Sequence, residues 1–457
     1  MKKLILSIIL LLSIPYSASA EEYSLADLYR LALDRSETIK IAEDDLYIAE
    51  RGKDKARAVF LPTLSAFGYH TRFSDEKRQD GILLQPENTN EWGLKLDQTF
   101  SLSGRELTAY KIAGNAITKS EFDLQAVKEE YLLNVSTQYF TVLRTKKELE
   151  ISRANVERLK KHRDAAKIRL EVGEVTKTVL LRAEAELAGA QSELIRSDNN
   201  LIITLTRLAK TVGISGDYDI KEPISEKDFK APEKLLADID LYMEDCQLSE
   251  TGCLKETAMS ERAEIKALTI QKQMAEDEVK YAKGSYWPSL SLEAKYLRQE
   301  NEPTTAFGLD ERIYGGLKLD FPFFEGGLRR AEVREANARL RQSEYSLSDL
   351  KHEISVEVEN AYLILKREAA LMNQVQAELA FALENYKSVT KQFQYGLADS
   401  IDTIDANTLL VNAERDLANA KYTYQLAFIY LKRAAGVLLK TILVQESTGE
   451  SAIPSEQ

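Results

Sequence analysis

Three acidic residues near the C-terminal end of the chain, Asp399, Asp402 and Asp405, are the clearest candidates for chemistry. They follow a turn in which Gly396 can adopt the left-handed conformation that ends a helix, and either Asp399 or Ser400 can cap the helix that comes next. Asp402 and Asp405 are three positions apart at the start of that helix, so both carboxylates can face one way. Paired carboxylates favour cations, and acidic residues at a helix start are also favoured by the helix dipole. The two interpretations are compatible, and both stay open.

A matching turn lies 223 positions earlier in the chain. Gly173 corresponds to Gly396, and Lys177 follows it at the expected start of another helix. The acidic position itself is not repeated, because Val179 stands where the second turn has Asp402. The two turns are therefore expected to play unequal parts, with either Lys177 or Glu174 taking part beside the acidic site.

The histidines give little support for catalysis. His70, His162 and His352 are far apart, and two of them lie in expected helices with no carboxylate or cysteine arrangement beside them. The sequence contains neither a phosphate-binding loop nor a zinc-protease motif. We therefore expect histidines on the surface, no catalytic residues, no cofactor and no enzymatic activity.

The two cysteines, Cys246 and Cys253, are close in sequence. They can form a local disulfide in an oxidising compartment, or remain two free thiols in a loop. A metal site is not expected, because two cysteines with no nearby histidine do not complete a tetrahedral shell.

The first twenty residues have the features of a signal peptide. Lys2 and Lys3 precede an apolar stretch at residues 4–14, and small residues at 18–20 form an expected cleavage site. Beyond it there is no apolar run long enough for a transmembrane helix. The formal net charge of −12 argues against binding to nucleic acid, which needs basic patches.

An internal repeat covers nearly the whole chain. The tetrapeptide at 94–97 recurs at 317–320, and many later positions repeat at the same offset of 223. The repeat divides the chain into a signal peptide, a first repeat, an inter-repeat equatorial segment, a second repeat and a flexible tail. These parts are residues 1–20, 21–215, 216–254, 255–440 and 441–457.

Each half is expected to contain a helix, two strands, a very long helix, a break and another long helix. The very long helices span about 104–171 and about 328–394, and neither contains proline. Nearly seventy residues at 1.5 Å per residue reach about 100 Å, so each helix must pack against other long helices. Apolar residues at steps of seven, from Val333 to Ala361, favour supercoiled packing.

The expected strands alternate apolar and charged residues, which is the pattern of an outer-membrane barrel but also of a soluble sheet with one wet face. The residues expected to face lipid are Phe67, Tyr69, Trp92, Leu94, Leu96, Leu292, Tyr296, Leu317, Leu319 and Phe321. Four strands cannot close a barrel, and lipid forbids an open edge, so a membrane role requires an oligomer. The expected fold class is an α+β membrane protein, with long antiparallel helices forming an α-barrel and four strands joining an oligomeric β-barrel.

These features resemble the TolC family of outer-membrane efflux proteins. The resemblance covers nearly all of the chain after residue 20. It rests on the duplicated order of helices and strands, on the Phe-Pro-Phe-Phe-Glu-Gly-Gly sequence at 321–327, and on the tracts 173–187 and 395–420 around the two turns.

The resemblance implies a homotrimer with one twelve-stranded barrel in outer-membrane lipid and a periplasmic helical tunnel. It implies a periplasmic adaptor and an inner-membrane pump as partners. The implied activity is passive, as the exit duct of an efflux or type I secretion system. Asp402 and Asp405 match the family's aspartates at the periplasmic entrance, where three chains would form two acidic rings. The basic residue that locks the closed state in the family is replaced by Ala398, so this gate would be held differently.

The alternative from another class is a soluble periplasmic coiled-coil adaptor or scaffold. Such a protein would also be exported and acidic and would also carry heptads. It has no need, however, for four strands of lipid-spanning length with aromatic residues on one face.

Overall fold

The structure is a computed structural model that describes residues 21–222, 250–304 and 310–442. The expected signal peptide, Cys246 and residues 443–457 of the expected tail lie outside these ranges. The expectation of a flexible tail was wrong for Thr441 and Ile442, which are buried. The chain forms two compact units. One comprises residues 1–40, 126–262 and 353–457, and the other comprises 41–125 and 263–352. Each unit therefore combines segments from both sequence repeats.

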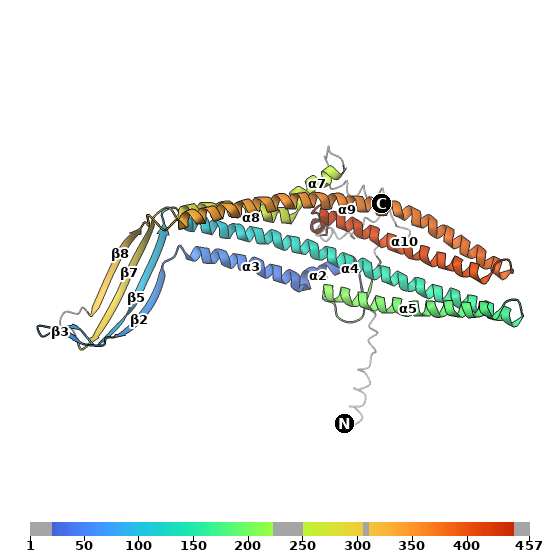
Figure 1. Ribbon diagram of the computed structural model, residues 1–457, viewed down its shortest axis with the longest axis horizontal. Coiled ribbons are helices and arrows are strands. Elements are labelled where there is room, and N and C mark those ends of the chain that lie inside the picture. The colour runs from blue at the N-terminus through green and yellow to red at the C-terminus, as the bar shows by residue number, and fades with distance from the viewer. Residues whose placement is uncertain (1–20, 223–249, 305–309, 443–457) are drawn as a thin grey trace, which may run out of the picture. The chain divides into compact units, whose positions relative to one another are not determined.

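The two very long helices are confirmed. Helix α4 (Arg105–Glu171) and helix α9 (Leu328–Gln394) have 67 residues each and contribute to both units. Helix α5 (Lys177–Val212) follows α4, and α10 (Ser400–Ala434) follows α9, so that each pair forms an antiparallel hairpin (Figure 1). None of these helices contains proline, which would remove an internal hydrogen bond.

Glycine ends both very long helices in the same way. Gly173 and Gly396 have φ values of 80° and 74°, a conformation that costs a residue with a side chain far more. Beyond them, the amide of Glu174 donates to the carbonyl of Arg169, and that of Leu397 donates to the carbonyl of Gln392, each at 2.8 Å. These bonds, from the residue after each glycine to the carbonyl five positions earlier, are those of a Schellman motif. The two turns expected from the sequence are thus both present.

The first unit has an apolar core where short elements pack on the long helices. Helix α2 (Leu25–Arg35) places Leu28 against Leu132 of α4 and Leu208 of α5 in one buried cluster. Strand β1 (Glu21–Tyr23) pairs in parallel with β6 (Tyr218–Ile220) beside this cluster. Helix α7 (Glu250–Glu261) belongs to the same unit.

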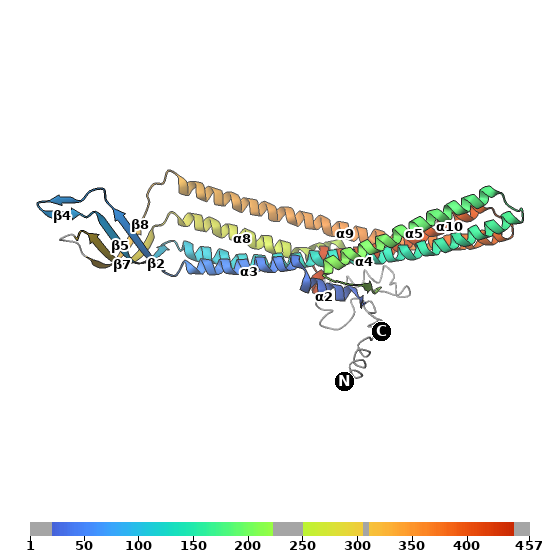
Figure 2. The ribbon, with the colours of Figure 1, turned by 90° about the horizontal axis from the view of Figure 1, so that it is seen from below.

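The second unit contains the sheet and the parts of the helices nearest to it in sequence. Its other helices are α3 (Glu37–Ala58), most of which lies in this unit, and α8 (Ala263–Gly284). Val279 and Ala282 of α8 pack on Ala336 of α9. The buried carboxylate of Asp277 pairs with Lys111 of α4 at 2.9 Å. Figure 2 shows α3, α4 and α8 running toward the sheet.

Four antiparallel strands form the sheet. They are β2 (Thr63–Arg72), β5 (Asn88–Ser101), β7 (Ser289–Glu302) and β8 (Glu311–Asp320), and their spatial order is β2-β5-β7-β8. A hairpin of β3 (Lys77–Gln79) and β4 (Ile82–Gln85) is inserted between β2 and β5. Each repeat contributes one pair of strands, and the β5–β7 pairing joins the repeats. None of the helices that the structure describes is both long and apolar enough to cross a membrane.

Candidate functional site

The sheet separates apolar from charged side chains. Residues directly opposite each other in antiparallel strands point to the same side, so the register assigns every residue to a face. Leu94 lies opposite Tyr296, and Leu292 lies opposite Leu317. The apolar face, as defined by this register, carries the apolar residues Leu64, Ala66, Trp92, Leu94, Leu96, Phe100, Leu290, Leu292, Ala294, Tyr296, Ile313, Leu317 and Leu319. It is open in the single chain, where Ile313 is 79% and Leu317 is 74% exposed.

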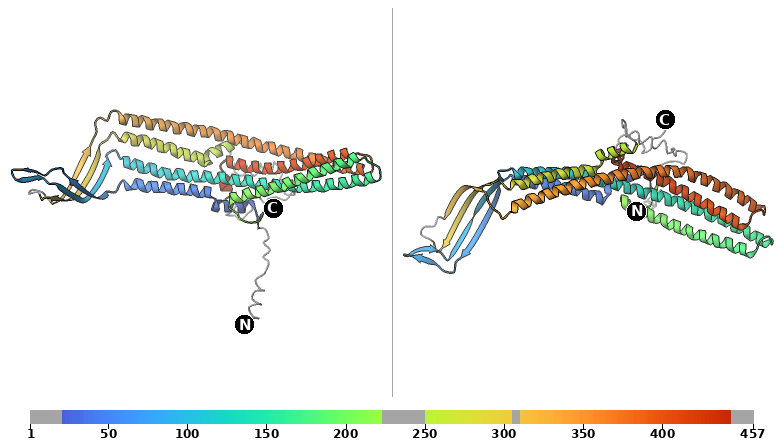
Figure 3. Two further views of the ribbon diagram at one scale, coloured as in Figure 1. Left: turned by 60° about the horizontal axis from the view of Figure 1, so that its bottom comes forward. Right: turned by 45° about the horizontal axis from the view of Figure 1, so that its top comes forward.

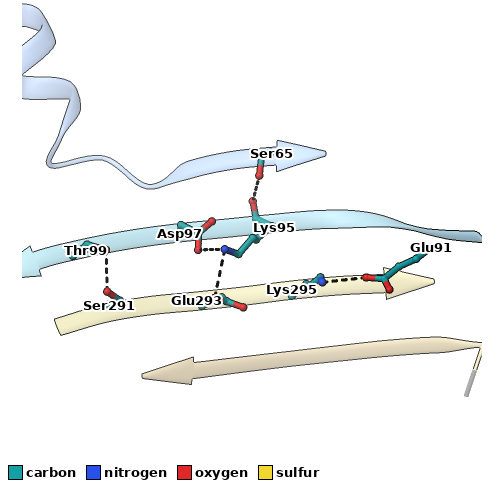
Figure 4. A network of polar contacts seen from close by, with 8 residues as sticks. All are labelled: Ser65, Glu91, Lys95, Asp97, Thr99, Ser291, Glu293 and Lys295. Atoms are coloured by element: carbon teal, nitrogen blue, oxygen red, sulfur yellow. Dashed lines mark hydrogen bonds and ion pairs between the residues drawn. The ribbon is translucent and has the colours of Figure 1, made fainter. Parts of the chain in front are cut away.

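The opposite, polar face carries a network of ion pairs and hydrogen bonds (Figure 4). Lys95 contacts Asp97 at 2.9 Å and Glu293 on the neighbouring strand at 3.5 Å. Lys295 contacts Glu91 at 3.3 Å on the same β5–β7 pair. Exposed pairs of this kind add little stability, and removing their charges from water would be costly.

The expectation for Phe67 and Tyr69 was wrong. These residues lie opposite Gly93 and Glu91, which places both rings on the polar face rather than with Trp92 and Leu94. Gly93 is the reason that Phe67 fits there, because a Cβ atom at position 93 would lie 3.0 Å from Cζ of Phe67. The ring instead covers the glycine, and the ammonium of Lys295 lies 4.3 Å from its centroid.

At the tip of the second hairpin, Asp399 and Asp402 cap the start of α10 reciprocally. Asp399 accepts hydrogen bonds from the amides of Ile401 and Asp402 at 2.7 and 2.9 Å. The amide of Asp399 in turn donates to Oδ2 of Asp402 at 3.0 Å. Asp399 and Asp402 therefore stabilise the start of α10. This geometry agrees with the interpretation in which acidic residues are favoured at the start of a helix.

Asp405 has no such role. It is exposed and, within the described residues, makes no hydrogen bond or ion pair. It nevertheless lines the same open pocket as Asp402, of about 450 Å³, between α9 and α10. Asn385, Gln392 and Leu397 line the pocket with them. The spacing of three residues thus brings both carboxylates to one side of the hairpin, as the sequence predicted.

The first hairpin ends differently. Thr176 precedes α5 but makes no side-chain capping bond, and Lys177 begins the helix as an exposed residue. The only contact that reaches across this turn among the described side chains joins Arg169 and Glu174, at 3.7 Å. The two hairpin tips are therefore unequal in both charge and capping.

The expectation of a surface position was wrong for His162. This residue of α4 is only 8% exposed, and its Nε2 lies 2.8 Å from the hydroxyl of Ser400 in the second hairpin. Burial, reinforced by the positive charge of Arg169, lowers the pKa of His162. One pattern in the sequence indicates this position. Asn155, Arg158, His162 and Arg169 are separated by steps of three, four and seven, which places them on one face of α4.

Two features bear on metal and disulfide chemistry. Among the described residues, no group of histidine, cysteine, aspartate or glutamate side chains is arranged to hold a metal ion. Cys253 lies buried on α7 and is disulfide-bonded, whereas Cys246 lies outside the described residues. The pairing of the two cysteines stays a prediction.

Comparison with protein families matches both halves of the chain to one model, described as outer membrane efflux protein, over residues 28–214 and 254–437. The chain belongs to the outer membrane efflux protein family. The match includes all four strands of the sheet as well as the long helices, which a soluble adaptor or scaffold would not explain.

Named relatives of this efflux protein span nearly its whole length. It is 22% identical to outer membrane protein TolC of Escherichia coli over 451 residues, covering 96% of this chain and 87% of that protein. It is 22% identical to the alkaline protease secretion protein AprF of Pseudomonas aeruginosa, covering 91% of this chain and 84% of that protein. The efflux protein is an outer-membrane exit duct, and the members of its family are channels.

A solved structure shows the same fold. The Campylobacter jejuni CmeC outer membrane channel matches this efflux protein with a TM-score of 0.76 at 17% identity, covering 93% of this chain and 89% of that one. The α+β fold class expected from the sequence is thereby confirmed.

Proposed function

We propose that three copies of this chain assemble into one channel, with the four-stranded sheets joined edge to edge in the outer membrane. The observation that carries the proposal is the open sheet. Strands β2 and β8 each have a neighbour on one side only among the described residues, and the other side presents unpaired backbone groups. Such edges cannot exist in lipid, so β8 of one copy must pair with β2 of the next. Three copies would give twelve strands, within the range of known barrels.

The dimensions of the apolar face support its contact with lipid. From Trp92 to Phe100, β5 advances eight residues, or about 27 Å at 3.4 Å per residue, close to the apolar band of about 25 Å in outer-membrane barrels. Aromatic residues stand at both ends of this band. Trp92 contacts Tyr296 at one end, and Phe321 contacts Phe323 at the other. Aromatic girdles of this kind mark the two membrane interfaces.

The polar face would then line the water-filled lumen. Its lysines and carboxylates are paired across β5 and β7, so the wall carries both signs of charge. Phe67 and Tyr69 would project into this lumen rather than into lipid. We infer passive conduction through this lumen with no enzymatic step.

The hairpin tips would form the periplasmic entrance. In a threefold assembly Asp402 and Asp405 would each occur three times around the axis, forming two acidic rings that favour cations and repel anions. The partners would be a periplasmic adaptor and an inner-membrane pump. The names of AprF, a secretion protein, and of the efflux protein family both describe export, which the pump would power.

The assembly is tested by joining its proposed edges with disulfides. Ser65 of β2 is replaced by cysteine, together with one of three β8 residues on the same face, Tyr314, Gly316 or Lys318. At least one pair is expected to give covalent trimers on a non-reducing gel of the outer-membrane fraction. The matched control carries Lys95→Cys in β5 with the same β8 substitutions. It should remain monomeric, because β7 separates those strands within one chain and β2 would separate them between neighbouring copies.

Native mass measurement of the detergent-extracted protein gives an independent count of copies. A mass of three chains together with ion conductance in a planar bilayer would support the proposal. Recovery from the soluble periplasm, or a mass of one chain, would overturn it.

A further inference from the structure

We propose that Arg169 and His162 of α4 form a latch that holds the second hairpin against the first, and that protonation of His162 loosens it. The proposal rests on the proposed function, because the consequence of loosening is a wider periplasmic entrance. The latch itself is a contact within one chain, and it can be tested without a conducting channel.

A polar seam joins the two hairpins along one face of α4. Amide Nδ2 of Asn407 donates to Oδ1 of Asn155 at 2.7 Å. One turn further along, Arg158 makes two hydrogen bonds to the carboxylate of Glu414, at 3.2 and 2.9 Å. Figure 3 shows α4 and α5 beside α9 and α10 over this length. The seam then reaches His162 and finally Arg169, at the level of the turn.

Arg169 binds the C-terminal end of α9. Its guanidinium donates to the carbonyl of Phe393 and, at 3.1 Å, to the carbonyl of Gln394. These carbonyls belong to the last turn of α9, where a positive charge is favoured, and that of Phe393 also accepts from the amide of Gly396 at 3.1 Å. The guanidinium also lies 4.2 Å from the centroid of the Phe393 ring. Arg169 therefore binds the second hairpin both through charged donors and through the face of an aromatic ring.

His162 is held between three elements. Its ring nitrogen bonds the hydroxyl of Ser400 at the start of α10, and its ring lies 5.0 Å from the Phe393 ring of α9. The charge that acts on it is Arg169 of its own helix. From α5, apolar Leu187 and Ala190 pack nearby on Leu159. Within the described residues, no carboxylate makes a hydrogen bond or ion pair with the His162 ring.

Protonation would place a second positive charge in this buried site. Both ring nitrogens of a charged histidine are donors, and the site provides one hydroxyl partner and a nearby guanidinium. The joined state therefore favours neutral His162 and has a pKa lowered from the usual 6.5. In the separated state the ring is in water and its pKa is ordinary. Separation of the two hairpins is therefore accompanied by uptake of a proton at His162. This separation becomes more favourable as pH falls below about 6.5.

The latch is tested by measuring the distance between spin labels on the two tips. Labels are attached at Val172→Cys and Leu397→Cys, both at exposed positions, in a background with Cys246 and Cys253 replaced by serine. Labelled chain is diluted with an excess of unlabelled chain, so that only distances within one copy are read. The ratio of separated to joined tips in the otherwise unchanged chain should rise by up to about tenfold per pH unit below pH 6.5.

Two variants separate the parts of the latch. His162→Gln keeps a hydrogen-bonding side chain without a titrating ring, so the ratio should no longer change with pH. Arg169→Gln should raise the ratio by about tenfold or more at every pH, because bonds from a charged donor are lost. His352→Gln removes an exposed histidine of α9 and should behave like the parent chain.

The outcomes distinguish this proposal from the proposed function. A pH response that persists in His162→Gln would overturn the role of His162, and an unchanged ratio in Arg169→Gln would overturn the latch. Failure of the trimer would appear instead as a single-chain mass and as missing conductance.

Discussion

The backbone amide of Asp399 donates to the carboxylate of Asp402 at 3.0 Å, while the carboxylate of Asp399 accepts from the backbone amide of Asp402 at 2.9 Å. This reciprocal pair begins α10 directly after the tip of the second hairpin. At the equivalent place in the first hairpin, Thr176 makes no side-chain cap. The turn is thus present in both copies of the repeat, but only the second copy has a helix N-terminus that is capped by side chains.

The difference in capping predicts a difference in local stability. Asp399→Ala should destabilise the first turn of α10 by about 1 kcal/mol, the usual cost of losing such a cap. Hydrogen exchange at the amides of Ile401 and Asp402 should accelerate by about fivefold, since these amides lose their acceptor. The matched variant Thr176→Ala should leave exchange at the start of α5 nearly unchanged. Equal acceleration at both helix starts would contradict this account.

Charge and capping at the entrance can be separated by substitution. Asp405→Asn removes one carboxylate from the tip pocket without touching the cap, because Asp405 makes no bond there within the described residues. It should raise single-channel conductance and weaken block by multivalent cations, since an acidic ring attracts and holds such ions. Asp402→Asn should weaken the block as well, but it should also accelerate exchange at the amide of Asp399. Unchanged conductance and block in Asp405→Asn would argue against an acidic ring.

Gly93 is required by the close approach of β5 and β7. A Cβ atom at this position would lie 2.0 Å from the carbonyl oxygen of Tyr296, which is far inside van der Waals contact. Gly93→Ala should therefore disrupt the strand pairing and abolish most of the heat-resistant assembly seen by gel electrophoresis. Gly316→Ala is the control, because nothing lies within 4 Å of a Cβ there. If both variants assemble normally, the packing around Phe67 is not essential.

The two tryptophans report on contact with lipid. Trp92 and Trp287 are the only tryptophans of the chain, so Trp92→Phe and Trp287→Phe each leave one reporter. In vesicles, each reporter should be quenched more strongly by lipids labelled near the headgroup than by lipids labelled at the chain end, as expected for interfacial aromatic residues. Leu96→Trp in a tryptophan-free background should show the opposite preference, because position 96 lies midway along the apolar face. Absence of lipid quenching for Trp287 would place that end of the sheet in water.

A disulfide between the two cysteines would give a mass difference between chains alkylated before and after reduction. If Cys253 is bonded to Cys246, alkylation of the unfolded chain should add no mass before reduction and two alkyl groups after it. Cys253→Ser then leaves one thiol that reacts without reduction. Modification of both thiols in the unreduced chain would show that the bond is absent. Removal of a local disulfide should affect stability modestly, because it closes a short loop.

Local features of this fold could be read from the sequence. The bounds of α4 and α9 follow from the absence of proline and from glycines 173 and 396, which must adopt a left-handed conformation to end each helix. The duplicated order of elements follows from the constant offset between the halves, although the repeat boundaries themselves remain a prediction. The side of the hairpin shared by Asp402 and Asp405 follows from helical spacing alone. In each case the deciding interactions lie within a few residues.

Only the tertiary structure shows which strand residues share a face and that His162 is buried. Alternation defines two faces for each strand, but both phases of β2 carry apolar residues, with Leu64 and Ala66 in one and Phe67 and Tyr69 in the other. Only the register against β5, which aligns Phe67 with Gly93, assigns them. His162 likewise gains its environment from Ser400, 238 positions away. The sequence by itself determined the elements and their order, because those depend on local periodicity. The tertiary structure decided which side chains meet, because pairing between distant segments is not encoded in the spacing of either segment.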